Sequence, residues 1–199
     1  MSLRPRMTTT QHRGHVLVTG PDEEPVTATE MRDLLGIGGT ADDNLLAQMI
    51  VQAREDIEEV TGIAMLPQEW RLSLDRWPGA KDEWWSGVRQ GAISELTGSP
   101  GRLDLPRYPL AAVDSVTVYD GSGASTVVNV SATFDVDTYS RPGRLALKSG
   151  KTWPVALRET NAISIVYSAG YADVASVPAG IKRAVQALAA YLYAHRGDG

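Results

Sequence analysis

Apolar residues recur at three- and four-residue steps over residues 42–62, which predicts an amphipathic helix. Asp42 to Asn44 offer N-capping oxygens at its start, and Gly62 is placed to end it. The apolar stripe comprises Leu45, Leu46, Met49, Ile50, Ala53, Ile57 and Val60. The polar side comprises Gln48, Gln52, Glu55, Glu58 and Glu59. We expect these carboxylates to be solvated, because no histidine lies near them in the sequence.

A second long helix is predicted over residues 177–196, where Pro178 suits the first turn. Its apolar stripe comprises Ile181, Val185, Leu188 and Leu192, and the small residues Ala184, Ala187, Ala189 and Ala190 allow close approach of another helix. A shorter helix is expected after Thr27, since Thr27 and Glu30 have the spacing of a capping box and Gly36 follows the apolar face. We expect the terminal helix to pack on the first two helices, on another chain, or on both.

Between the long helices the period changes to two, which indicates strands. Trp70, Leu72 and Leu74 alternate with polar residues from residue 68 onward. Further strands are expected at residues 113–120, 125–130, 133–138, 144–148 and 162–167, and the Asp120-Gly121-Ser122-Gly123 turn predicts a hairpin. Prolines interrupt these runs, so we expect short antiparallel strands with exposed edges.

These elements predict an α+β fold in which both ends of the chain form a small helical bundle. The bundle is expected to comprise residues 26–66 and 177–199, with a β-rich antiparallel insert at residues 67–176 between the second and last helices. Residues 1–25 are expected to form a flexible arm, because their first fifteen residues carry three arginines and no acid. The 199 residues, of which 43% are hydrophobic, are enough for one domain with a sizeable core.

A long loop is predicted over residues 77–101, where no clear period exists. It contains Trp84 and Trp85, and adjacent tryptophans are typical anchors of protein interfaces. The alternative is that the two rings cover the sheet. Trp84 and Trp85 are therefore a candidate binding site for a neighbouring subunit or a tail component.

Composition limits the possible functions. The chain has no cysteine, which excludes disulfides and thiolate sites and fits synthesis in a reducing cytoplasm. Its N-terminus lacks the apolar stretch of a signal peptide, and no run of apolar residues is long enough to span a membrane, so we expect a soluble protein. The net charge of −5 argues against wrapping of nucleic acid.

No motif in the sequence predicts a catalytic, cofactor-binding or metal site. The three histidines form no ligand pair such as HExxH, and neither a GxSxG elbow, a Walker loop nor a dinucleotide fingerprint is present. An enzyme built on carboxylates such as Asp75, Asp82, Glu83 and Asp104 would need a cleft that brings them together. A β-rich protein- or carbohydrate-binding module with helical flanks is the main alternative, but it gives no reason for the flanks.

An ordered set of residues resembles the head-tail connector, or adaptor, proteins of tailed bacteriophages. The set comprises Val26-Thr27-x-x-Glu30, Asp43-x-Leu45-Leu46-x-x-Met49-Ile50-x-x-Ala53-Arg54-x-x-Ile57-Glu58-x-x-Thr61-Gly62, Leu105-Pro106-Arg107-Tyr108-Pro109-Leu110-x-x-Val113, Ala169-Gly170-Tyr171, Val177-Pro178 and residues 184–196. Such proteins are encoded by phages, prophages and gene transfer agents. They form a ring, usually twelve-fold, beneath the portal protein of the capsid, and they are structural rather than catalytic.

The resemblance implies a place and partners for this chain. It places the chain at the head-tail junction of a virion or phage-like particle, in contact with other copies of itself, the portal protein and a downstream tail or stopper protein. DNA would pass through the ring without sequence-specific binding, which an acidic chain favours. By this resemblance, the candidate portal-binding residues are Leu188, Tyr191, Leu192, Tyr193, His195 and Arg196. Residues 1–25 and 78–100 look longer than the family pattern and inherit no role from it.

Overall fold

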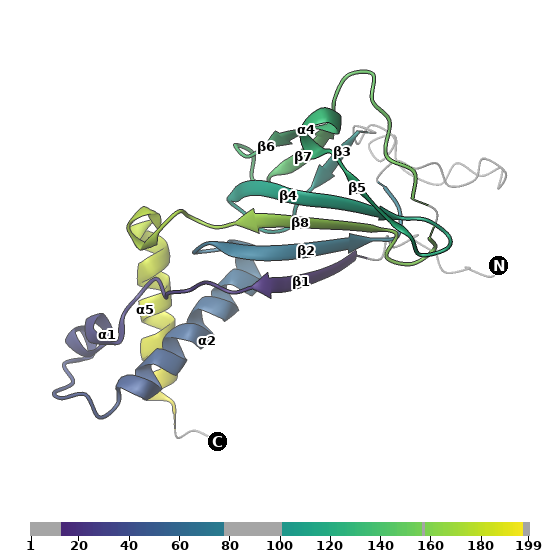
Figure 1. The fold of residues 1–199 in the computed structure, drawn as a ribbon. Coiled ribbons are helices and arrows are strands. Elements are labelled where there is room, and N and C mark those ends of the chain that lie inside the picture. Colours follow the sequence, from purple (N-terminus) through teal and green to yellow (C-terminus); the bar gives the residue numbers. More distant parts are fainter. Residues whose placement is uncertain (1–12, 78–100, 157, 197–199) are drawn as a thin grey trace, which may run out of the picture.

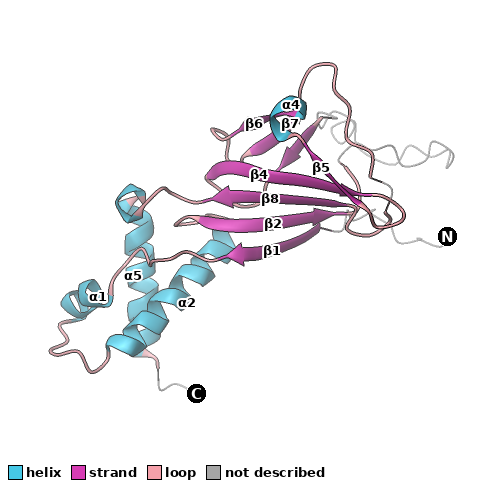
Figure 2. Ribbon diagram, viewed as in Figure 1, coloured by secondary structure: helices cyan, strands magenta, loops and turns pink. Residues whose placement is uncertain are grey.

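The computed structural model describes residues 13–77, 101–156 and 158–196 and has an α+β fold (Figures 1 and 2). A helical bundle lies at one end of a five-stranded antiparallel sheet, and a smaller sheet packs on the other side of the molecule. Trp84 and Trp85, as well as Asp82 and Glu83, lie outside the described residues.

The five-stranded sheet has the order β1-β2-β8-β4-β5, and all neighbouring strands are antiparallel. Its strands are β1 (Arg13–Thr19), β2 (Gln68–Leu74), β8 (Ile163–Ala169), β4 (Leu110–Tyr119) and β5 (Ser125–Val128). The smaller sheet has the order β3-β7-β6 and comprises β3 (Arg102–Asp104), β7 (Arg144–Leu147) and β6 (Phe134–Asp137). A short helix, α4 (Val130–Thr133), links β5 to β6.

One face of the five-stranded sheet is buried and the other is open to solvent. On β2, β8 and β4, alternate apolar residues such as Leu72, Ile165 and Val116 are fully buried, as the period of two predicts. They pack against Leu103 and Leu145 of the smaller sheet, in one hydrophobic core. The opposite face carries polar side chains and is called the open face below.

The helical bundle has a hydrophobic core of its own. It is formed by α1 (Ala28–Leu35), α2 (Asp43–Thr61) and α5 (Ala179–Ala194), and its fully buried residues include Met31, Leu46 and Val185. The Thr27–Glu30 capping box is present, and Gly36 and Gly62 end α1 and α2 in the left-handed conformation that glycine adopts at least cost. The three helices are thus confirmed. No helix in the described part of the chain has the length and apolar character that crossing a membrane requires.

The structure differs from the sequence-based expectations in several details. Residues 13–19 form β1, an edge strand paired with β2, where a flexible arm was expected. Glu58 is buried, with 5% of its surface exposed, although the helical period placed it on the solvated side. Val60, expected in the apolar stripe, is 87% exposed, since the side of α2 that is buried in its second half carries Ala53, Arg54 and Glu58. Strand β3 and the short helix α4 were not predicted, and the other strands agree with the prediction apart from their ends.

Candidate interaction surfaces

Buried polar side chains join the helical bundle to the sheet. The Glu58 carboxylate accepts hydrogen bonds from Arg54 Nη1 at 2.9 Å, from the backbone N–H of Met65 at 2.7 Å and from Gln68 Nε2 at 2.8 Å. Because a buried charge is stable only when it is paired and hydrogen-bonded, this cluster ties the end of α2 to the start of β2.

Arg107 forms a second link at the same junction. Its guanidinium donates to the Glu58 backbone carbonyl and to the Glu59 carboxylate, the latter at 2.7 Å, and lies 4.5 Å above the centre of the Trp70 ring. Gly62 allows the close approach, since a Cβ there would lie 3.3 Å from the Pro106 carbonyl oxygen. The LPRYPL segment of the family resemblance therefore holds the sheet against the end of α2.

A surface hollow of about 400 Å³ lies at this junction, and we call it the junction hollow. Its lining residues are His15, Glu59, Gly62, Trp70, Pro106 and Arg107. The hollow combines an aromatic and a proline surface with an exposed carboxylate, since the Glu59 side chain is 80% exposed. This combination suits a protein side chain better than a small charged ligand.

His15 fixes the edge strand β1 at the rim of the junction hollow. Its ring stacks on Trp70 with the ring centres 4.5 Å apart, and its Nε2 lies 2.8 Å from the Tyr167 hydroxyl. The Tyr167 oxygen also accepts the Arg107 backbone N–H. Burial and the nearby Arg107 charge lower the pKa of His15 to about 4. Burial also raises the pKa of the Tyr167 hydroxyl.

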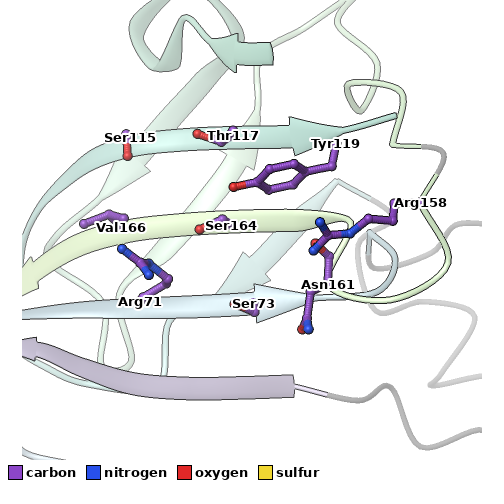
Figure 3. A pocket seen from close by; sticks show the side chains of 9 residues that line it. All are labelled: Arg71, Ser73, Ser115, Thr117, Tyr119, Arg158, Asn161, Ser164 and Val166. Carbon is purple, nitrogen blue, oxygen red and sulfur yellow. The ribbon is translucent and has the colours of Figure 1, made fainter. Parts of the chain in front are cut away.

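A second hollow, of about 460 Å³, lies on the open face of the five-stranded sheet (Figure 3). Arg158 lies with its guanidinium 4.5 Å above the Tyr119 ring and donates to the carbonyls of Thr160 and Asn161. Arg71 makes no hydrogen bond or ion pair with another described residue. The lining comprises Arg71, Ser73, Ser115, Thr117, Tyr119, Arg158, Asn161, Ser164 and Val166. These side chains offer hydroxyls and guanidinium groups but no carboxylate or imidazole, so the hollow suits polar recognition.

The candidate portal-binding residues of α5 fall into two groups. Leu188 and Leu192 are partly buried in the bundle core, and the Tyr193 hydroxyl donates to the Asp42 carboxylate at 2.5 Å. Tyr191 is 58% exposed, its ring lies 4.2 Å from that of His195, and Arg196 lies over the Tyr193 ring. Tyr191, His195 and Arg196 therefore present a surface, whereas Leu188, Leu192 and Tyr193 hold the helix in place.

Of the four carboxylates considered for a possible enzyme, the structure describes Asp75 and Asp104, and these two lie apart. Asp75 follows β2 and accepts the Asn161 backbone N–H at 2.7 Å, whereas Asp104 ends β3 in the other sheet. Nowhere in residues 13–77, 101–156 and 158–196 do three or more histidines or acids gather as metal ligands would.

The turn between β6 and β7 was not singled out from the sequence. It carries Tyr139, which is 97% exposed, next to the exposed Arg141 and Pro142. The segment contains Asp137, Ser140 and Pro142-Gly143, which are residues typical of turns and could have identified it from the sequence.

Comparison with known proteins gives one family and one group of structures. The family model of the phage gp6-like head-tail connector protein matches residues 26–139. No curated protein matches the chain. A chain in the neck of an empty gene transfer agent (GTA) particle with C6 symmetry is 24% identical, with a TM-score of 0.73 over 94% of this chain and 86% of that chain.

Two further solved structures have the same fold. A chain in the virion of a native GTA particle is 25% identical, with a TM-score of 0.69 over 93% of this chain and 86% of that one. A chain in the neck of a native GTA particle with C12 symmetry is 23% identical, with a TM-score of 0.67 over 92% and 86% of the two chains. The similarity thus extends over both the helical bundle and the sheets.

Proposed function

Because the chain belongs to the phage gp6-like head-tail connector protein family, we propose that it is an adaptor subunit at the head-tail junction of a virion or phage-like particle. Copies of the chain form a ring under the portal protein, join the capsid to the tail and leave a channel for DNA. The family match over more than half of the chain carries this proposal. The neck structures with C6 and C12 symmetry support a ring.

The role is structural rather than catalytic. Both described hollows have shapes and side chains that suit protein contacts, and the family is one of connectors. The open face of the sheet and its free edge strands supply surfaces for neighbouring copies or for the next tail component, as edge strands with unpaired N–H and C=O groups do.

The exposed end of α5 is the proposed contact with the portal protein. Tyr191, His195 and Arg196 offer an aromatic ring, an imidazole and a guanidinium side by side, and tyrosine and arginine are enriched among residues that dominate binding. Leu188, Leu192 and Tyr193 position this surface from within the bundle.

Electron microscopy of particles made with and without the chain tests the placement. We expect density for the chain between portal and tail, and heads without tails when it is missing. Density elsewhere in the particle, or normal particles without the chain, would overturn the proposal.

Substitution at Tyr191 tests the portal contact. We expect Tyr191→Ala to lower binding of the chain to portal-bearing heads by about tenfold or more, since a central tyrosine commonly contributes that much. Val155→Ala is the control, because Val155 is 73% exposed and lies outside α5. Removing residues 187–199 would be a poorer test, because it also removes Ala189 from the bundle core.

A further inference from the structure

The two edge strands of the five-stranded sheet have no backbone partner on their outer sides. Strand β1 pairs only with β2, and β5 pairs only with β4, so each leaves one row of N–H and C=O groups unpaired (Figure 1). Within the described part of the chain, no backbone hydrogen bond outside these pairings involves residues 13–19 or 125–128. An unpaired row of this kind is a ready template for another strand.

Neither edge carries the features that commonly block such pairing. Residues 14–19 and 125–128 contain no proline and no acidic or basic residue except His15, whose pKa of about 4 keeps it neutral at pH 7. The one irregularity is a register shift between Leu17 and Thr19, at the end of β1. Most of β1 and the whole of β5 are therefore open to pairing.

The smaller sheet provides a contrast. Its edge strands are β3 and β6, and both carry charged residues. These are Arg102 and Asp104 on β3, and Asp135 and Asp137 on β6. Charged side chains on an edge oppose pairing with a further strand. The two uncharged edges among the described strands are thus the opposite edges of one and the same sheet.

Both uncharged edges present aliphatic side chains to solvent. On β1, the consecutive residues Val16, Leu17 and Val18 are 61%, 42% and 43% exposed. On β5, Val127 is 72% exposed. Covering these side chains with a partner strand removes apolar surface from water while it satisfies the unpaired backbone groups, so both terms favour pairing.

The side chains of the two edges match on the open face of the sheet. Val16 pairs with Arg71 across β1 and β2, and Val127 pairs with Thr117 across β5 and β4. These two partners both line the hollow on the open face (Figure 3). Because paired residues in neighbouring strands point to the same face, Val16 and Val127 lie on the open face as well.

The edges also match on the opposite face. Leu17 pairs with Trp70, and Val128 pairs with Val116, and both of these partners are buried in the sheet core. Each edge therefore has an aliphatic residue on both faces. When the two valines of the open face lie side by side, Leu17 falls beside Val128 with no change of face.

Strand direction determines how two copies would join. Four antiparallel steps separate β1 from β5, so the two strands run in the same direction. Neighbours in a ring of many copies differ by a small rotation, which preserves both direction and face. Strand β5 of one copy and β1 of the next would therefore pair in parallel. Two different edges meet in this contact, so it repeats from copy to copy and can close into a ring.

We propose that β1 of each subunit pairs in parallel with β5 of the next copy of this chain, with Val16 beside Val127 and Leu17 beside Val128. The proposal rests on the proposed ring and identifies a contact that builds it. The five-stranded sheets of all copies then join into one continuous sheet, in which neither edge is left unpaired.

Disulfide formation between copies tests this contact, because the chain has no cysteine of its own. Strands in a sheet lie about 4.8 Å apart, within the Cα separation of about 4.4–6.8 Å that a disulfide spans. Particles are made with the double variant Val16→Cys/Val127→Cys, and their proteins are separated without reductant after mild oxidation. We expect a ladder of linked multimers, because each copy is joined to two others.

Control variants separate this pairing from other contacts. The matched control is Val16→Cys/Thr126→Cys, because Thr126 is also exposed on β5 but pairs with Val118 and lies on the opposite face. It should give no ladder, and a ladder as strong as that of the first pair would overturn the proposal. Each single variant should remain unlinked. A linked dimer of Val16→Cys alone would show that two β1 strands meet, which also overturns it.

The outcomes distinguish this contact from the ring itself. A chain that is absent from the neck in electron micrographs contradicts the proposed function before any disulfide is examined. A chain that is present in the neck and gives no ladder overturns the strand pairing and leaves the proposed function intact.

Charged substitutions provide a second measurement, which decides the matter if the cysteine variants fail to assemble. Val16→Glu and Val127→Lys should each lower incorporation into particles by about fivefold or more, because each places a charge on an apolar edge. Both side chains are exposed, so the circular dichroism spectrum should not change.

Combining the two charges tests whether the residues are neighbours. The double variant Val16→Glu/Val127→Lys should restore incorporation, since opposite charges on adjacent strands attract. The matched control Val16→Lys/Val127→Lys should not restore it, because like charges repel. Equally low incorporation of both double variants would overturn the proposal.

Discussion

At the scale of single residues, Glu58 is the polar side chain on which the junction most depends. Replacing it with alanine would leave the buried Met65 N–H and Gln68 amide without their acceptor, whereas Arg54 would keep its 2.8 Å ion pair with Glu24. A buried donor left without its partner costs about 1–3 kcal/mol. We expect Glu58→Ala to lower the free energy of unfolding by about this amount, measured by urea denaturation.

Glu55→Ala is the matched control, because Glu55 lies on the same helix beside Arg54. Its ion pair with Arg54 spans 3.4 Å, and its side chain is 62% exposed. Exposed pairs contribute about 0–1 kcal/mol. Equal losses of stability in the two variants would contradict the role of Glu58.

His15 gives stability a specific dependence on pH. Its pKa in the folded chain, about 4, lies below the ordinary value of 6.5, so the unfolded chain binds a proton first as the pH falls. The contribution of His15 to the free energy of unfolding is therefore fully present above pH 6.5 and is lost as the pH falls from 6.5 to about 4. Allowing for screening by solvent at this partly exposed site, we expect a loss of about 1–2 kcal/mol.

The measurement compares the original chain with His15→Gln by thermal unfolding from pH 7 to pH 4. Carboxylates elsewhere titrate in both proteins, so only the difference between the two curves reports on His15. If the unfolding temperatures of the two proteins change with pH in parallel, the pKa of His15 is the same in the folded and unfolded chains.

At the scale of elements, the helices could be predicted because their signals are local. The capping box at Thr27 and the glycine ends of α1 and α2 each lie within a few residues of the helix that they bound. The alternation along β2 is equally local. Beta-strand β1 was missed because its partner β2 lies more than fifty residues away in the chain, and its apolar run of Val16 to Val18 shows no alternation.

The interaction surfaces were less predictable for a related reason. Helical period assigns a residue to a side of α2 but does not reveal that the LPRYPL segment returns to cover Glu58. Similarly, the exposure of Tyr139 depends on Gly143 packing against Leu110 of another strand. Contacts between distant segments, rather than local patterns, thus decide which side chains are buried and which are presented.

At the scale of the whole molecule, two hydrophobic cores are joined by one polar junction. The bundle core and the sheet core share no buried residue, and Glu58, Arg54 and Arg107 connect them. The junction hollow lies at this connection, and its lining comes from the end of α2, from β1 and β2, and from the segment before β4.

The overall charge leads to a prediction about DNA. A net charge of −5 gives the chain no overall attraction for phosphates, which suits the proposed passage of DNA. We expect no mobility shift of duplex DNA by the purified chain at an ionic strength of about 0.15 M. The control is the triple variant Gln52→Lys/Glu55→Lys/Asp56→Lys, which raises the net charge by five, from −5 to 0, and makes the exposed face of α2 basic. This variant should retard duplex DNA, and the retardation should decrease as the salt concentration rises. Saturable binding by the unaltered chain would contradict the idea that its surface lets DNA pass.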